Sequence, residues 1–191
     1  MEFLTRSRNV SDSIKQRLEN IYRSVPEEKV ISSGNILFRI VEAIYMCTED
    51  DAISVYYFNL FEKALNSETR GLIHPSHLEL LKFVTKDEID ILRKIKQKTY
   101  EFIETADLKN RKFYNWQSKQ NEFPVGELNE PDKFELYIHN LQDRLKLMFW
   151  PVYKQDGVWE NGVQTGLVKR SRMVLTVSGQ HFLKSICKNE N

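Results

Sequence analysis

The sequence predicts a mainly α-helical fold, in which an N-terminal helical bundle precedes a small α+β, winged-helix-like unit with a β-hairpin. Three observations carry this prediction. Apolar residues recur every three or four positions through residues 11–105, which is the helical period. Residues 106–130 are polar and contain Pro and Gly, which is typical of a loop or hinge. Residues 131–188 combine a helical pattern, two strand-like runs beside tight-turn pairs, and a closing helix.

The first half of the bundle is expected to consist of two helices. Ser11 or Ser13 can cap the first of them. The second begins at Pro26, because proline suits the first helical position and the two glutamates that follow it favour the positive helix end. It extends to Cys47, and its middle, residues 36–46, is apolar on almost all sides. Such a helix lies at the centre of a core or at an oligomer interface.

The second half of the bundle is expected to contain three more helical segments. Acidic residues 49–51 open a helix that ends near Asn66. Residues 74–95 then predict two short helices that meet at Thr85, whose spacing to Glu88 fits a capping box. No part of this half has the alternating pattern of a strand, so the bundle is predicted to be entirely helical.

The C-terminal unit has a different pattern. Strand-like runs over residues 147–153 and 167–176 flank two tight-turn pairs, Asp156-Gly157 and Asn161-Gly162. A last helix begins near Ser178. A helix, a hairpin with a polar tip and a closing helix together are compatible with a small winged-helix-like layout.

Composition and charge describe an ordinary globular protein. Of the 191 residues, 41% are hydrophobic and 29% are charged, and the formal net charge is +1. A charge so close to zero argues against general electrostatic capture of nucleic acid or of an anionic membrane. No apolar run approaches the roughly 20 residues of a membrane-spanning helix, and the N-terminus does not resemble a signal peptide. We therefore expect a cytoplasmic protein with no membrane partner.

The motifs in the sequence predict neither a cofactor nor a metal site. The chain lacks the glycine-rich phosphate and dinucleotide motifs, the nucleophile elbow and the metalloprotease helix motif. His74 and His77 are three positions apart, but no third or fourth ligand accompanies them. Enzymatic activity is therefore left open as the weaker interpretation.

Arg70 and His77 form the one candidate catalytic pair. Their spacing resembles that of the HEPN ribonucleases, in which an arginine and a histidine of one helix converge on a phosphate and a ribose hydroxyl. A histidine can transfer protons near neutral pH, and an arginine can stabilise phosphoryl charge. Pro75 lies between the two residues and would interrupt a continuous helix. A histidine at a helix start is therefore the competing interpretation of His77.

A basic cluster on the predicted returning strand is the candidate nucleic-acid site. It consists of Lys169, Arg170 and Arg172. In the predicted loop, further basic residues alternate with aromatic ones: Lys109, Arg111, Lys112, Phe113, Tyr114 and Trp116. Such residues could contact phosphates and stack on bases. The competing interpretation is a solvated strand face and a loop whose aromatic residues dock on the core.

Three ordered pieces of the chain carry a resemblance to a known family. Residues 49–64 form an acid-led helix, and residues 74–92 combine a His-Pro opening, an apolar helix, an acid pair and an Ile-Leu pair. The third piece combines residues 144–147, Arg-Leu-Lys-Leu, with a strand hairpin and with residues 175–182, Leu-Thr-x-x-Gly-x-x-Phe. These pieces resemble the abortive infection alpha family of bacterial and phage-borne proteins. The family pattern has a glycine at the position of Lys146.

This resemblance implies a link to phage defence and supplies no catalytic residues. We therefore expect a component of a phage-defence system that is non-enzymatic or regulatory and acts through protein contacts. Homo-oligomeric contacts would involve the apolar helix over residues 26–47. One alternative is a nucleic-acid-binding, winged-helix-type regulator that uses Lys169, Arg170 and Arg172. The other is a ribonuclease toxin that uses Arg70 and His77.

Overall fold

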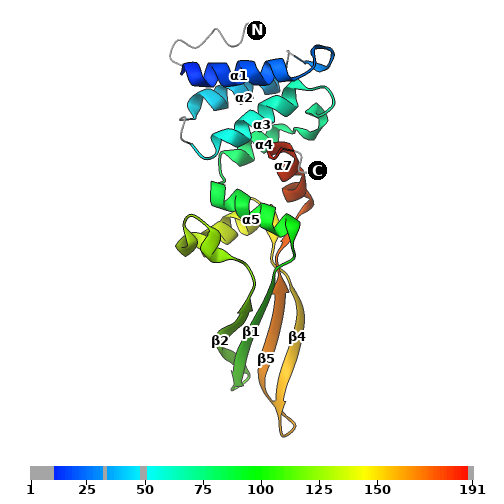
Figure 1. Cartoon of the computed structure of the whole chain (residues 1–191). Coiled ribbons are helices and arrows are strands. Elements are labelled where there is room, and N and C mark those ends of the chain that lie inside the picture. The colour runs from blue at the N-terminus through cyan, green and yellow to red at the C-terminus, as the bar shows by residue number, and fades with distance from the viewer. Residues whose placement is uncertain (1–10, 32–33, 48–50, 189–191) are drawn as a thin grey trace. The chain divides into compact units, whose positions relative to one another are not determined.

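The computed structural model describes residues 11–188 except for residues 32–33 and 48–50. The chain separates into two compact units (Figure 1). The helical unit consists of Met1–Lys86 with His181–Asn191, and the sheet unit consists of Asp87–Gln180. The sequence predicted a helical bundle over residues 11–105 and a separate α+β unit over residues 131–188. These domain bounds state which segments fold on their own, and they stay a prediction.

The helical unit is built around α3. Its helices are α1 (Asp12–Ser24), α2 (Asn35–Met46), α3 (Ser54–Leu65), α4 (Pro75–Leu81) and the C-terminal part of α7 (Val177–Ile186), with 3-10 turns η2 (Glu27–Lys29) and η3 (Arg70–Leu72). α3 contacts α1, α2 and α4, and most of its residues are buried. A helix that is surrounded by neighbours must be apolar on most of its surface, which matches its sequence.

Two polar side chains of α3 hold the end of α7. The Asn59 side-chain amide donates to the Ile186 carbonyl at 2.8 Å. The buried Lys63 ammonium donates to the carbonyls of Lys184 and Cys187. The last carbonyls of a helix have no partner within the helix, so these bonds cap α7.

The core explains the apolar sequence of α2. Four residues of this helix are buried, namely Leu37, Ile40, Val41 and Ile44, whereas Phe38 and Met46 are exposed. Of the two expected places for this helix, the core of the helical unit accounts for these four residues. An oligomer interface that uses its exposed apolar residues stays a prediction.

The sheet unit carries all six strands found in the described part of the chain. Its elements are α5 (Lys86–Gln97), β1 (Glu101–Lys109), β2 (Lys112–Asn121), η4 (Val125–Glu127), η5 (Pro131–Lys133), α6 (Phe134–His139), the π-helical turn η6 (Asn140–Arg144), β3 (Met148–Phe149), β4 (Val152–Glu160), β5 (Val163–Arg172) and β6 (Val174–Leu175). An antiparallel four-stranded sheet has the order β2-β1-β5-β4, and β3 pairs with β6 (Figure 1).

The prediction of a mainly α-helical fold with a winged-helix-like end is therefore wrong. The predicted loop over residues 106–130 contains the end of β1 and all of β2, which form one hairpin of the sheet. Every residue of β2 except Gln120 is exposed, so the strand lacks the alternation of apolar and polar residues that identifies a half-buried strand. The turn of this hairpin is Asn110-Arg111, with φ of 52° and 60°, and it lacks the usual glycine.

The second hairpin was predicted in part. The tight turn at Asn161-Gly162 is confirmed, since both residues have positive φ and join β4 to β5. The predicted turn at Asp156-Gly157 is wrong, because these residues lie within β4. A Cβ at Gly157 would lie 2.6 Å from the Trp159 indole nitrogen, so the glycine leaves room for that ring.

Lys146 occupies a turn that favours glycine. It lies between η6 and β3 with φ of 56°, in the left-handed region. The family pattern has glycine here, and glycine adopts this conformation without a steric penalty. Lys146→Gly is therefore expected to raise the free energy of unfolding by up to about 1 kcal/mol.

Thermal unfolding of the wild type and of Lys146→Gly would measure this change in the free energy of unfolding. Lys133→Gly is the matched control, because Lys133 has a negative φ of −91° and gains nothing from glycine. A lower melting temperature for Lys146→Gly would contradict the prediction.

Candidate functional site

His77 is a buried helix-capping residue. His74 is the N-cap of α4, and its Nδ1 accepts from the Ser76 backbone N–H at 3.2 Å. The Nδ1 of His77 accepts in turn from the His74 backbone N–H at 3.2 Å. The His77 side chain is only 7% exposed, and its ring lies edge-on to Phe182. These contacts account for His77 without catalysis.

The surroundings of this histidine disfavour its protonated form. Burial lowers the pKa of His77, and the nearby charges of His74 and His181 lower it further. An unprotonated Nδ1 is also what the hydrogen bond from His74 requires.

Arg70 lies on the 3-10 turn η3 and reaches toward Gly34. Gly34 has φ of 136°, and a Cβ there would lie 2.5 Å from an Arg70 guanidinium nitrogen. The guanidinium therefore rests on the backbone before α2, whereas His77 contacts His74 and Phe182. A convergence of Arg70 and His77 on one substrate stays a prediction.

The predicted basic cluster is divided between the two faces of the sheet. Lys169 lies 2.5 Å from the Glu104 carboxylate, and its ammonium lies 4.9 Å from the centre of the Trp116 ring. Arg170 and Arg172 are on the other face, because neighbouring side chains of a strand point to opposite sides. Acidic residues therefore offset part of the charge that the cluster would present to a phosphate.

The opposite face has its own partners. The Arg170 guanidinium lies 4.0 Å from the Asp156 carboxylate, and the Arg172 guanidinium lies 5.4 Å from the centre of the Tyr153 ring. The Tyr153 hydroxyl donates to the Glu101 carboxylate at 3.0 Å. Binding of nucleic acid by these basic residues stays a prediction.

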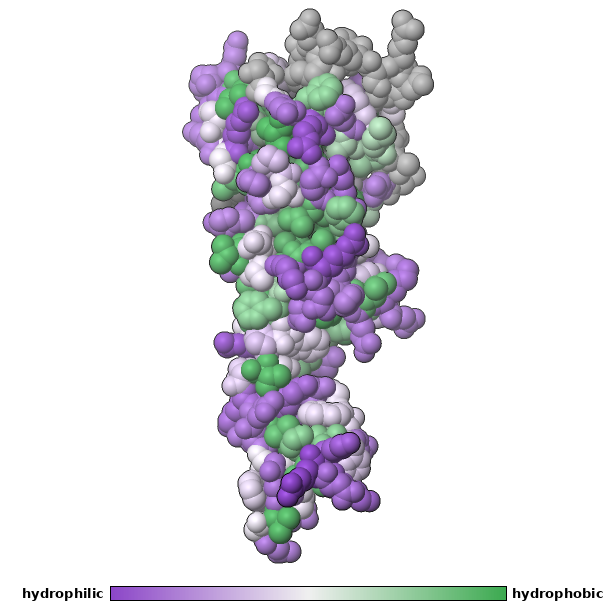
Figure 2. Space-filling view, turned by 180° about the vertical axis from the view of Figure 1, so that it is seen from behind, coloured by the Kyte–Doolittle hydropathy of each residue, from purple (hydrophilic) through white to green (hydrophobic). Residues whose placement is uncertain are grey.

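Aromatic side chains are exposed along both hairpins of the sheet. The exposed fractions are 40% for Phe113, 47% for Trp116 and 64% for Trp159. Tyr114 and Tyr153 are exposed as well. The space-filling view shows hydrophobic residues at the surface of the sheet among hydrophilic ones (Figure 2). The sequence prediction placed part of this set in a loop and missed Trp159 and Tyr153, which follow or precede polar residues in β4.

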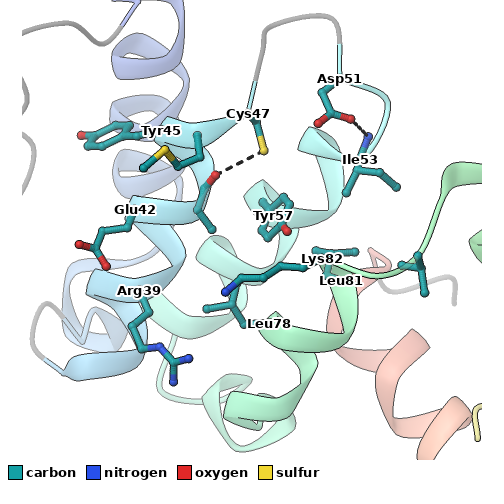
Figure 3. A pocket seen from close by; sticks show the side chains of 13 residues that line it. Arg39, Glu42, Tyr45, Cys47, Asp51, Ile53, Tyr57, Leu78, Leu81 and Lys82 are labelled. Atoms are coloured by element: carbon teal, nitrogen blue, oxygen red, sulfur yellow. Dashed lines mark hydrogen bonds between the residues drawn. The ribbon is translucent and has the colours of Figure 1, made fainter. Parts of the chain in front are cut away.

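A pocket of about 740 Å³ lies within the helical unit (Figure 3). Its lining comes from α2, α4 and the region of α3, and consists of Arg39, Glu42, Ala43, Tyr45, Met46, Cys47, Asp51, Ile53, Tyr57, Leu78, Leu81, Lys82 and Val84. Arg39 and Lys82 both pair with the Glu79 carboxylate, at 2.5 Å and 3.0 Å. This pocket could not be predicted from the sequence, because its lining comes from segments that are separated along the chain.

The reactive groups in this pocket are kept protonated. Burial raises the pKa of the Cys47 thiol, and the charge of Asp51 raises it further. Burial, with the charges of Cys47, Asp51 and Glu79, raises the pKa of Tyr57 to about 12. A protonated thiol is a weak nucleophile, so the pocket does not resemble a catalytic cysteine site.

Two further findings concern the described residues only. They contain no group of three or more His, Cys, Asp or Glu side chains that could hold a metal ion. Within the same residues, none of the helices has the length and apolar character needed to cross a membrane.

Comparison with known proteins identifies a family. A family model described as abortive infection alpha matches residues 6–186, nearly the whole chain. This match confirms the resemblance seen in the sequence. No curated protein and no solved structure matches the chain.

Proposed function

The chain belongs to the abortive infection alpha family, and from this premise we propose that it is a non-enzymatic component of a phage-defence system that acts through protein contacts. The family name indicates a role in abortive infection. The exposed aromatic residues of the four-stranded sheet are the observation that carries the proposal. Trp, Tyr and Phe are enriched at interfaces between proteins, so exposed rings on both hairpins favour a contact surface there.

The faces of the sheet, rather than its edges, are suited to these contacts. The pairing of β2 with β1 has register shifts at Ile103/Glu104 and at Thr105/Asp107. The pairing of β4 with β5 has shifts at Val152/Lys154 and at Val158/Trp159. Such irregularities at edge strands discourage the addition of another strand.

The proposal predicts that truncating two exposed tryptophans abolishes defence. Bacteria that express the wild-type chain, or Trp116→Ala with Trp159→Ala, would be challenged with a panel of phages. Protection by the double variant is expected to fall to that of an empty vector, because these are the two most exposed aromatic side chains of the four-stranded sheet and tryptophans dominate the binding energy of many interfaces. Leu136→Ala is the control, since Leu136 is 61% exposed on α6, away from the sheet. Full protection by the double tryptophan variant would contradict the proposal.

The same challenge separates the two alternative functions. A ribonuclease toxin requires Arg70, so Arg70→Ala would abolish both protection and the degradation of cellular RNA. A nucleic-acid-binding regulator would use Lys169, Arg170 and Arg172, and the double alanine variant of the two arginines would lose salt-sensitive binding to DNA or RNA. The exposed basic turn at Lys109, Arg111 and Lys112 favours this second alternative over the first. The proposed function expects both sets of variants to protect as well as the wild type.

A further inference from the structure

One face of the four-stranded sheet gathers three exposed aromatic rings. Glu104 pairs with Lys169 across β1 and β5, and residues directly opposite in an antiparallel pair share a face. Trp116 contacts Lys169 and Phe113, so both rings lie on this face. We call Phe113, Trp116, Trp159, Lys169 and Glu104 the aromatic face.

Trp159 joins this face from the other edge strand. Gly157 is paired with Leu167, which is two residues from Lys169 on the same side of β5. The Trp159 indole lies over Gly157, since a Cβ there would meet it at 2.6 Å. The aromatic face therefore extends from β2 across β1 and β5 to β4, with a tryptophan on each edge strand.

We infer that the aromatic face binds the same face of a second copy of this chain. This inference rests on the proposed function and names one partner for its protein contacts. A dimer formed by stacked sheets would bury both tryptophans in the way that the two sheets of a β-sandwich bury their inner faces. The register shifts at both edges favour contact through a face of the sheet over contact through an edge strand, and the aromatic face carries both exposed tryptophans.

The charges on the aromatic face favour a second copy over a nucleic acid. Lys169 and Glu104, on the two inner strands, contribute one positive and one negative group to the centre of this face. A two-fold axis that runs between Lys169 and Glu104 would place the Lys169 of each copy opposite the Glu104 of the other, so the face can be complementary to itself. A phosphate backbone would instead require a surplus of positive charge at the centre of the face.

Light scattering of the full chain over a range of concentrations tests this inference. The wild type is expected to show a dimer, and Trp116→Ala with Trp159→Ala is expected to raise the dissociation constant by at least about 30-fold. Tyr114→Ala is the matched control: Tyr114 is 46% exposed on β2 but pairs with Asp107 on the opposite face. A dimer that survives the double variant, or that Tyr114→Ala weakens equally, would overturn the inference. Circular dichroism would confirm that each variant is folded.

A charge swap gives a second test that does not depend on loss of contact area. Lys169→Glu makes both charges of the pair negative, and Glu104→Lys makes both positive. Each variant alone is expected to be a monomer, and an equimolar mixture is expected to form a heterodimer. Two variants that remain monomeric when mixed would contradict a self-complementary face.

The outcomes also separate this inference from the proposed function. A wild-type monomer whose double tryptophan variant loses phage protection would overturn the dimer and leave contacts with another protein in place. A dimer whose disruption leaves protection unchanged would overturn the proposed use of the sheet and leave the dimer in place. Binding of single-stranded DNA or RNA to the monomer through the same tryptophans would also overturn the inference.

Discussion

Gly179→Ala is expected to lower the free energy of unfolding by about 3 kcal/mol or more, which would leave little of the stability of an ordinary domain. A Cβ at Gly179 would lie 2.0 Å from the Leu147 carbonyl oxygen, a backbone atom that cannot rotate away. The same carbonyl accepts from the Thr176 backbone N–H at 3.1 Å, so its movement would also disturb that bond.

Urea unfolding followed by circular dichroism would measure the effect. Gly126→Ala is the matched control, because nothing lies within 4 Å of a Cβ at Gly126, and its stability should change by less than about 0.5 kcal/mol. Equal midpoints for the two variants would show that α7 can move away from Leu147 at little cost.

This contact gives a physical meaning to the C-terminal family pattern. The Thr176 hydroxyl donates to the Lys146 carbonyl at 2.8 Å and accepts from the Gly179 backbone N–H at 3.0 Å. Phe182, the last residue of the pattern, is completely buried. The threonine caps the start of α7, the glycine permits the close approach, and the phenylalanine fills the core. The pattern therefore specifies packing rather than chemistry.

The first helix, α1, could be predicted because its burial is one-sided, whereas the helix predicted from Pro26 begins only at Asn35. Ile14 and Leu18 lie on the buried side of α1, and this spacing of four is visible in the sequence. The same reasoning failed for β2 and β4, which are exposed on both faces and show no period of two. The aromatic residues of β2 alternate with polar ones and were therefore predicted to lie in a loop. In the structure, β2 and β4 are the outer strands of the sheet.

The candidate sites were predicted less well than the helices, because a site depends on contacts between distant segments. Lys169 was identified by its charge, but its partners Glu104 and Trp116 lie more than 50 residues earlier in the chain. His77 was identified by its chemistry, but its burial against Phe182 depends on the C-terminal helix. Sequence spacing alone contains neither piece of information.

Asp87→Ala is expected to destabilise the sheet unit by about 3 kcal/mol or more, because it leaves several buried or half-buried donors without an acceptor. The Asp87 carboxylate accepts from the backbone N–H groups of Asn129 and Glu130, both at 2.9 Å. It also accepts from the Asn129 side-chain amide at 2.6 Å and from the Tyr137 hydroxyl at 3.2 Å. One buried carboxylate thus holds the segment between η4 and η5 against the start of α5.

The acid pair of the family pattern is therefore structural. Glu88, the second member, accepts from the Asn140 side-chain amide at 2.6 Å and is buried like Asp87. The sequence identified the pair as a helix start, but the partners lie more than 40 residues later and could not be inferred from it.

The hydrogen bonds to the Asp87 carboxylate also predict that the free energy of unfolding depends on pH. Burial by itself would raise the pKa of Asp87, but the hydrogen bonds from Asn129, Glu130 and Tyr137 outweigh it, and the pKa lies below its ordinary value. In the unfolded chain the pKa returns to about 3.9. The charged carboxylate therefore contributes its full stability above about pH 4, and this contribution is lost as the pH falls through the lower pKa of the folded state.

Asp87→Asn tests this dependence, because an amide keeps one acceptor oxygen but cannot ionise. Between about pH 4 and pH 2, the wild type should lose more free energy of unfolding than Asp87→Asn, so the two curves should converge. Asp132→Asn, at an exposed carboxylate of η5, should follow the wild-type curve. Parallel curves for the wild type and Asp87→Asn would mean that the Asp87 carboxylate binds protons equally well in both states. That result would contradict a network in which Asn129 and Glu130 hold the ionised form.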